Sequence, residues 1–424
     1  MSKKTVLTLP PFVSEYRSPG GNKKTDELRT LFSNVLKILP DFRCCQEMDP
    51  YPGDERIRAI RFSGLPCEGR STEVFAYLGI PADASAASPV PGMVLIHGGG
   101  GHAYAEWVRA WTDRGYAAIS FDGFAQQYVG SHARYDASLE FWTNDPASHL
   151  PVDFFSSADK PFMQQWFTYY ISDILLANSL LRADARIQKD RIGLTGISWG
   201  GFAASVAVCY DDRFAFAAPV YGCGFQDVSQ TEWGRCFRGK GISDVWDAKL
   251  LMPTVSTPIH WFNGDSDPFF DAVSSTASAA AAQNAALTLL PAFTHGQTEG
   301  SAIPELFRFA DEQTGRGKGN IRILSVEISD GKATLRYSLP QDSADVSAFI
   351  FYKTEDLKYT EKELNEGWKH QKGEAENGTA VLSIPGEARF FYFFLIEKSE
   401  SAEEALRASS GVISISSIRG RFHD

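Results

Sequence analysis

One stretch of the sequence decides the fold: LTGISWGG, at residues 194–201. An apolar run precedes it, and the small, helix-compatible residues 202–208 follow it. This order predicts a strand, a sharp turn and a helix, with Ser198 at the apex. Glycines at 196 and 200 remove side chains that would collide with neighbouring chain, and the N-terminus of the helix favours negative charge beside the serine. A Gly/Ser-rich turn without chemistry would fit these five residues equally well, so partner residues must decide.

The composition is that of a soluble globular protein with more than one domain. The chain has 424 residues, of which 43% are hydrophobic and 22% are charged. The formal net charge is -11 and the basic residues form no cluster, which argues against nucleic acid and membrane surfaces as partners. No apolar run is long enough to span a membrane.

Localisation, cofactors and oligomeric state have weaker signals. The apolar run near the N-terminus is short and broken by Pro10 and Pro11, so we expect no signal peptide and a cytoplasmic protein, although a signal removed earlier is compatible with this sequence. None of the six cysteines has Cys-x-x-Cys spacing, which favours free thiols over a zinc site or a disulfide scaffold. We expect no metal and no cofactor, and a homo-oligomer is compatible with the sequence.

Strand-like and helical segments alternate through the middle of the chain. Strands are expected at 93–96, 116–121, 191–195, 214–220, 259–262 and 287–290, and helices at 103–114, 162–183, 200–210, 274–286 and 299–312. This alternation predicts an α/β fold with a mostly parallel, doubly wound sheet. A helix over 25–39 and a hairpin of 55–62 with 71–80 precede it. Two long stretches without periodicity, 122–160 and 221–257, are of the kind that is usually functional.

The pattern of predicted elements changes after the glycine-rich segment 315–319. Short strands are expected at 321–328, 332–338, 346–352, 379–384, 389–396 and 411–416, which predicts a small β-sandwich of immunoglobulin or fibronectin type. We therefore divide the chain into an N-terminal extension with a helix (1–50), a catalytic α/β domain (51–316) and a C-terminal β-sandwich domain (317–424).

A nucleophilic Ser198 needs a base and an acid, and both are expected at the carboxyl ends of later strands. His295 follows the last strand of the alternating region, in the chain order Ser…Asp…His. Asp267 lies in the turn after the strand before it and is the preferred acid. Asp265 is the second choice, or otherwise a turn-capping carboxylate, and Asp271 is a weaker third. His102 and His132 lack such a positional argument, and His260, inside a strand, is expected to be structural.

Acyl transfer also needs hydrogen-bond donors for an oxyanion. The amide of Trp199, directly after the nucleophile, is one expected donor. The glycines after His97 let the backbone turn amides toward the cleft, so Gly98 or Gly99 is the expected second donor, and the sequence leaves open which. His97 itself is expected to be a buried structural residue. A phosphate-binding loop is disfavoured, because no Gly-x-Gly-x-x-Gly and no following Lys-Ser/Thr is present.

Four segments together resemble the α/β-hydrolase superfamily: VLIHGGGG, RIGLTGISWGG, NGDSDPFF and THG, in this order. They look most like the branch of acetyl xylan esterases, cephalosporin deacetylases, dienelactone hydrolases and prolyl-oligopeptidase-like proteins. The C-terminal β-domain resembles that of the PhoPQ-activated pathogenicity-related group. The resemblance covers about residues 55–313 and implies a Ser198–His295–Asp267 triad and an acyl-enzyme. The chain differs from deacetylases in its HGGGG run and in Ser-Trp-Gly-Gly where Ser-Gln-Gly-Gly is expected.

These features predict a serine esterase that removes a short acyl group from a carbohydrate-like alcohol. The two long loops would wall the cleft, with substrate contacts from Tyr128, Trp142, Phe225 and Trp233. One alternative is a peptidase or amidase of prolyl-oligopeptidase-like type, although roughly 90 residues before the first core strand leave no room for a propeller. The other is a non-catalytic binding protein on a hydrolase scaffold, against which the complete set of triad residues argues.

Overall fold

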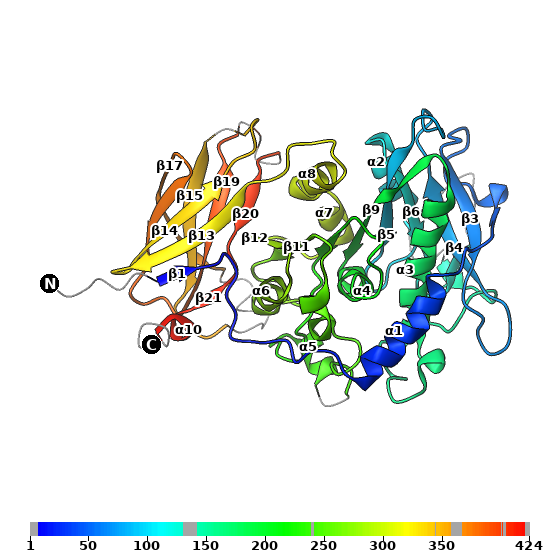
Figure 1. Ribbon diagram of the computed structural model, residues 1–424, viewed down its shortest axis with the longest axis horizontal. Helices are drawn as coiled ribbons and strands as arrows, with labels where there is room; N and C mark the ends of the chain where they lie inside the picture. Colours follow the sequence, from blue (N-terminus) through cyan, green and yellow to red (C-terminus); the bar gives the residue numbers. More distant parts are fainter. Residues whose placement is uncertain are drawn as a thin grey trace.

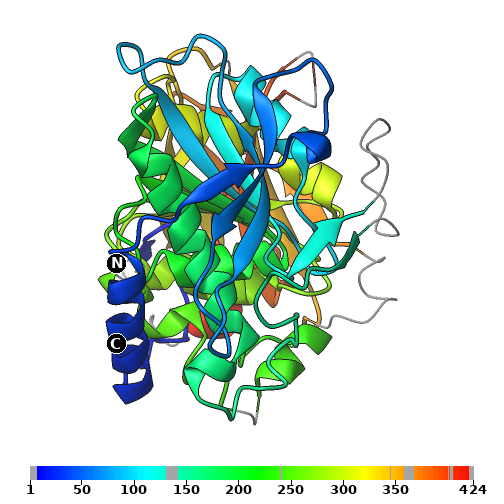
Figure 2. The same ribbon diagram turned by 90° about the vertical axis from the view of Figure 1, so that its right-hand side faces the viewer.

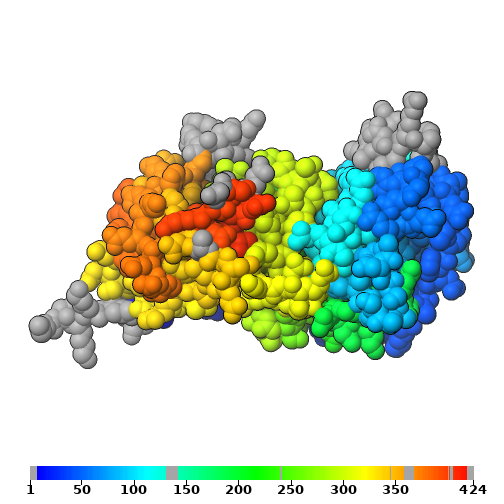
Figure 3. Space-filling model, turned by 90° about the horizontal axis from the view of Figure 1, so that it is seen from above, coloured from blue at the N-terminus to red at the C-terminus, as the bar shows by residue number. Residues whose placement is uncertain are grey.

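The computed structural model describes residues 7–129, 142–238, 241–343, 345–357, 367–399, 401 and 404–419. His132 and part of the first long loop lie outside these residues. Two parts lie side by side in an elongated molecule, an α/β body and a β-sandwich (Figures 1 and 3). Among the described residues, no helix combines the length and apolar character needed to cross a bilayer. All six cysteines are free.

The α/β body is built on a nine-stranded sheet in the order β12-β11-β10-β9-β5-β6-β4-β3-β2. The six strands from β12 to β6 are parallel, and β4, β3 and β2 extend the sheet with antiparallel pairs. Their bounds are β2 (Phe42–Cys44), β3 (Ile57–Ser63), β4 (Glu73–Gly79), β5 (Val90–Ile96), β6 (Ala117–Phe121), β9 (Ile187–Ile197), β10 (Phe216–Val220), β11 (Ile259–Gly264) and β12 (Ala285–Leu290). The predicted α/β-hydrolase sheet is confirmed.

Helices pack against this sheet because their apolar residues recur at helical spacing. They are α1 (Lys23–Val35), α2 (Ala105–Asp113), α3 (Trp166–Ala183), α4 (Trp199–Ala207), α6 (Ala272–Ala281), α7 (Gln297–Ser301) and α8 (Pro304–Gln313). Every residue of α3 from Trp166 to Leu181 is buried, since α3 lies against the sheet, α1 and α4. Figure 2 shows α1 on the outside of this layer. In the second long loop, the short helices are α5 (Glu232–Phe237), η5 (Ala248–Leu250) and η6 (Met252–Thr254).

Two predicted helices differ from those observed. The helix expected over 274–286 ends at Ala281, because residues 285–290 pair in parallel with β11 along its whole length. Strand pairing here overrides the helix propensity of an alanine-rich run. The helix expected over 299–312 is two helices, α7 and α8. Pro304 starts α8 at its first position, where a residue without an N–H is tolerated.

The β-sandwich has two five-stranded sheets, β1-β13-β14-β18-β17 and β16-β15-β19-β20, with β21 pairing β19. The bounds are β1 (Leu7–Leu9), β13 (Arg322–Ser329), β14 (Lys332–Ser338), β15 (Val346–Lys353), β16 (Lys369–Lys372), β17 (Glu374–Glu376), β18 (Thr379–Ser383), β19 (Phe390–Glu397), β20 (Arg407–Ser409) and β21 (Ile413–Ser414). The strand expected over 411–416 is instead β21 followed by helix α10 (Ile415–Arg419), and β16 and β17 were not predicted.

The N-terminal segment is not a separate extension. Strand β1 pairs antiparallel with β13 in the sandwich, and the chain then runs along the body to α1 (Figure 1). Strand β2 forms the far edge of the nine-stranded sheet. The predicted 1–50 unit is therefore divided between the two parts, because its short strands complete sheet edges at opposite ends of the molecule.

Candidate active site

Ser198 lies on a strained turn between β9 and α4. Its backbone has φ 57° and ψ -116°, a conformation that non-glycine residues rarely adopt. A Cβ at Gly196 would lie 2.2 Å from the carbonyl oxygen of Gly200, and a Cβ at Gly200 would lie 2.2 Å from that of Ile96. Both clashes are with backbone that cannot move aside. The two glycines are therefore a steric requirement of the turn.

Three strand ends bring Ser198, His295 and Asp267 together. The Oγ of Ser198 lies 2.8 Å from Nε2 of His295, and Nδ1 of His295 lies 2.6 Å from Oδ2 of Asp267. Asp267 is fully buried, the His295 side chain is 15% exposed and Ser198 is partly exposed. This arrangement can transfer a proton from a hydroxyl to an imidazole while a carboxylate holds the other ring nitrogen.

The three candidate aspartates have three different partners. Asp267 Oδ1 accepts hydrogen bonds from the amides of Phe269 (2.9 Å) and Phe270 (2.8 Å), which leaves Oδ2 for His295. Asp265 instead accepts a hydrogen bond from the Tyr392 hydroxyl at 2.8 Å. Asp271 caps α6 and accepts from the amide of Ser274 at 2.7 Å. Of the three carboxylates, the one at 267 is hydrogen-bonded to His295.

The loop that carries His295 is held from two sides. The Tyr221 hydroxyl donates to the carbonyl of Thr294 at 2.5 Å, and its ring lies 4.5 Å from the imidazole of His295. A Cβ at Gly264 would lie 2.9 Å from the carbonyl oxygen of Phe293, so glycine permits the close approach of this loop. Tyr221 was not singled out from the sequence. Its position at the end of β10, one strand from Ser198, was the available signal.

The glycine loop lies against the turn at Ser198. Burial lowers the pKa of His97 to about 3, so the ring is neutral. Its Nε2 accepts from the amide of Gly123 at 3.1 Å, and Nδ1, 2.8 Å from the Gly98 carbonyl, is then the donor. Tyr170 donates to the His97 carbonyl at 3.1 Å. Because peptides are trans and planar, tethering these two carbonyls turns the amides of Gly98 and Gly99 the opposite way.

Three of the four predicted substrate contacts pack in the interior instead. Tyr128 is 2% exposed, and Trp142 stacks on His102 with ring centroids 4.3 Å apart. Phe225 is 1% exposed, and its amide donates to the buried carboxyl of Asp247 at 2.8 Å. These rings stabilise the loops, because a loop that covers a core must bury its own apolar side chains. This corrects the prediction for all three.

Three other aromatic rings lie beside Trp199 and His295, and one of them is a predicted contact. Trp233, the fourth predicted contact, is partly exposed and lies 5.0 Å from the Trp199 ring. Phe154 is 43% exposed and lies 5.4 Å from the same ring. Phe269 is 44% exposed and lies 4.8 Å from the imidazole of His295. Phe154 and Phe269 were not predicted as substrate contacts. Each lies in a segment that was expected to form part of the site, the first long loop and the NGDSDPFF turn.

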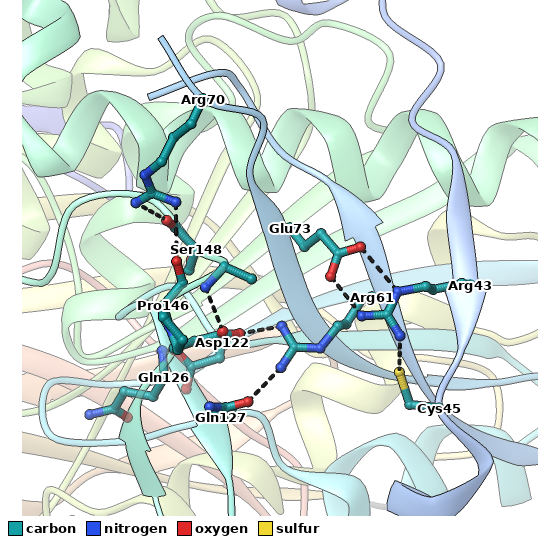
Figure 4. A network of polar contacts seen from close by, with 12 residues as sticks. Arg43, Cys45, Arg61, Arg70, Glu73, Asp122, Gln126, Gln127, Pro146 and Ser148 are labelled. Carbon is teal, nitrogen blue, oxygen red and sulfur yellow. Dashed lines mark hydrogen bonds and ion pairs between the residues drawn. The ribbon is translucent and has the colours of Figure 1, made fainter. Parts of the chain in front are cut away.

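Arginines anchor the first long loop to the β3–β4 hairpin (Figure 4). Arg61 of β3 forms a buried ion pair with Asp145 and donates to Oε1 of Gln127 at 2.7 Å. Arg70 donates to the carbonyl of Ser148 at 2.7 Å. The loop also pairs its own short strands, β7 (Gln126–Tyr128) with β8 (Trp142–Asn144). These contacts fix the loop that carries Phe154 near the turn at Ser198.

In the part of the chain that the structure describes, no group of three or more histidines, cysteines or acidic residues could hold a metal ion. His149 of the first long loop and Asp173 of α3 form a buried pair, with Nε2 and Oδ2 2.8 Å apart, and the His149 ring stacks on Tyr169.

Similar proteins place the chain in a family. The dienelactone hydrolase family matches residues 74–303, more than half of the chain. Among solved structures, an acetyl xylan esterase from Paenibacillus is 15% identical, with a TM-score of 0.52 over 67% of this chain and 92% of that one. An acetyl xylan esterase from Thermoanaerobacterium is 12% identical (TM-score 0.49; 68% and 91% covered). An acylaminoacyl peptidase from Pyrococcus horikoshii is 15% identical (TM-score 0.46; 67% and 44% covered).

At these identities the structural likeness shows the fold alone, and a search of curated proteins finds no significant match. The family match shows more than a shared fold. It spans the glycine loop, the turn at Ser198, the Asp267 turn and His295 in a single alignment. The chain belongs to the dienelactone hydrolase family.

Proposed function

We propose that this protein is a serine esterase that removes a short acyl group from a carbohydrate-like alcohol. The observation that carries the proposal is the hydrogen-bonded chain from Ser198 Oγ through His295 to the buried Asp267. Three separate strand ends contribute to it, so chance proximity in one loop does not account for the arrangement.

His295 acts as the general base in the first step. Nε2 takes the proton of Ser198 as Oγ attacks the ester carbonyl, and Asp267 stabilises the imidazolium that forms. The tetrahedral intermediate then collapses, the alcohol leaves with the proton from Nε2, and an acyl-enzyme remains. Water, deprotonated by His295, attacks the acyl carbonyl in the same way. The carboxylic acid departs and Ser198 recovers its proton.

Backbone amides hold the negative oxygen of both tetrahedral intermediates. Trp199 is the first residue of α4, where an amide has no acceptor within the helix. Gly98 and Gly99 both turn their amides away from the tethered carbonyls, and a Cβ at Gly98 would lie 3.3 Å from the Cβ of Ser198. Donors that are fixed before the reaction need no reorganisation as charge develops on the oxygen.

The substrate class is argued from the aromatic rings and from the fold. The half-exposed rings of Phe154 and Phe269 lie beside Trp199 and His295, and flat apolar rings suit the faces of a sugar. The Paenibacillus protein that shares the fold is an acetyl xylan esterase, which favours acetyl as the acyl group. An amidase uses the same triad, and a non-catalytic binding protein would use the same walls, so both are outcomes of the test.

Labelling with a fluorophosphonate probe tests the chemistry. Wild type is expected to be labelled, Ser198→Ala is expected to remain unlabelled, and Ser301→Ala in α7 serves as the matched serine control. Turnover of p-nitrophenyl acetate, octanoate and an acetyl anilide then tests the substrate class. Faster cleavage of octanoate contradicts the short-acyl proposal, faster cleavage of the anilide favours the amidase, and an unlabelled wild type refutes the serine hydrolase.

A further inference from the structure

Asp265 joins three segments of the chain at one buried carboxylate. It is 3% exposed and stands two residues before Asp267 in the turn after β11. Its Oδ1 accepts from the amide of Ala292, at 3.3 Å, in the loop that leads to His295. Its Oδ2 accepts from the hydroxyl of Tyr392, at 2.8 Å, on β19 of the sandwich. The acid turn, the base loop and the sandwich therefore share one side chain.

Two aromatic residues of the sandwich, Tyr392 and Trp368, contact this turn. Tyr392 is fully buried and stacks on Phe351, with ring centroids 5.1 Å apart and planes 11° apart. Trp368 packs edge-on against Tyr392 at 5.1 Å, and its Nε1 donates to the main-chain carbonyl of Asp265 at 3.1 Å. The hydroxyl of Tyr392 and Nε1 of Trp368 therefore both donate to Asp265. Stacked rings leave the hydroxyl little freedom to move away.

The same domain also covers β12, the edge strand from which the His295 loop departs. The amide of Leu289 on β12 donates to the Oγ of Ser409 on β20 at 2.7 Å. Arg407, also on β20, donates to the buried carboxylate of Glu305 on α8 from its amide at 2.7 Å and from its guanidinium at 2.7 and 2.9 Å. The sandwich is thus fixed to the elements around the turn, so a contact through Tyr392 can hold the turn in place.

We propose that Tyr392 and Trp368 are positioning residues, through which the C-terminal domain sets the geometry of the Asp267–His295 pair. The inference rests on the proposed function of Ser198. Asp265 transmits the effect, because it fixes the start of the acid turn through its main chain and the His295 loop through Ala292. A displacement of about 1 Å in a catalytic group is sufficient to lower a rate about 100-fold.

Tyr392→Phe tests the proposal, because it removes one hydroxyl and keeps the ring stack. We expect kcat for p-nitrophenyl acetate to fall at least about 10-fold, with KM within about twofold, since the substrate contacts are untouched. The rate of fluorophosphonate labelling should fall with kcat. Tyr352→Phe is the matched control: Tyr352 is a buried tyrosine of the same domain, but it lies in the core of the sandwich. This control should keep wild-type kcat.

A double mutant separates positioning from loss of stability. If Tyr392 acts through Asp265, Tyr392→Phe combined with Asp265→Ala loses no more activity than Asp265→Ala alone. Additive losses, equal losses in Tyr352→Phe, or wild-type kcat in folded Tyr392→Phe each overturn the proposal. The downfield proton resonance of the His295–Asp267 hydrogen bond gives a readout that does not need turnover. It should shift in Tyr392→Phe even if Ser198→Ala shows that the esterase assignment is wrong.

Discussion

Replacing Asp267 by asparagine should move the ring proton of His295 from Nδ1 to Nε2. The amides of Phe269 and Phe270 both donate to Oδ1 of Asp267, at 2.9 and 2.8 Å. An asparagine must present its carbonyl oxygen to these donors, so its NH₂ group takes the place of Oδ2 and faces Nδ1 of His295. Nδ1 must then accept, which puts the ring proton on Nε2. A protonated Nε2 cannot take the proton of Ser198.

The expected effect on kcat follows from the loss of the proposed general base. We expect kcat for p-nitrophenyl acetate to fall by about 10³ to 10⁴, or about 4 to 5.5 kcal/mol in activation free energy, with little change in KM. Steady-state kinetics after titration of active sites measures both constants, and thermal unfolding verifies that Asp267→Asn is folded.

Asp271→Asn is the matched control for this change. Asp271 is buried in the same segment, but it caps α6, and asparagine caps helices as well as aspartate does. We expect it to keep kcat within about threefold, since it has no contact with the imidazole. Retention of more than a tenth of wild-type kcat by Asp267→Asn, or an equal loss in Asp271→Asn, would refute the assignment of the acid.

Three further predictions concern stability and binding. Burial raises the pKa of Asp122 to about 8, above its value in the unfolded chain. Its contribution to the free energy of unfolding is therefore full at low pH and is lost as pH rises toward 8. The free energy of unfolding of Asp122→Asn relative to wild type, measured in urea, should increase by about 2 to 3 kcal/mol from pH 5 to pH 7. A Cβ at Gly200 would lie 2.2 Å from a β5 carbonyl, so Gly200→Ala should lower the free energy of unfolding by about 3 kcal/mol or more, and an unchanged denaturation midpoint would contradict the steric argument. Phe269→Ala removes the exposed ring beside His295 and should raise KM for p-nitrophenyl acetate about fivefold, whereas Phe42→Ala at the distant sheet edge should leave KM unchanged.

Local patterns were sufficient to predict the turn at Ser198 and the parallel sheet. Gly196 and Gly200 are required by contacts within a few residues or to the adjacent strand, so their spacing carries the information. The rings of Tyr128 and Trp142 could not be assigned in this way. Whether an aromatic residue in a long loop faces a cleft or the core depends on where the loop lies. Here that is decided by Arg61 and its distant partner Asp145.

The turn NGDSDPFF shows why the sequence could rank its aspartates but not explain both. A hydrogen-bonding partner for the acid was expected at the end of the last strand, and Asp267 lies against His295. The partner of Asp265 is Tyr392, 127 residues later and in another sheet. No periodicity or spacing connects the two. A role as a turn-capping carboxylate does not describe these contacts, because both oxygens of Asp265 accept hydrogen bonds from outside the turn, from Ala292 and from Tyr392.

The α/β body and the sandwich share part of one hydrophobic core across residue 316. Trp368, Tyr392 and Phe394 belong to the same buried cluster as the strands of the α/β body, while the sandwich interior forms a second cluster. Glu305 is fully buried because Arg407 of the sandwich neutralises it, and an unpaired buried carboxylate would be costly. The α/β body therefore completes its core, and its charge pairing, with residues from the C-terminal domain. A domain bound in this way is part of the scaffold that holds the Asp267 and His295 loops.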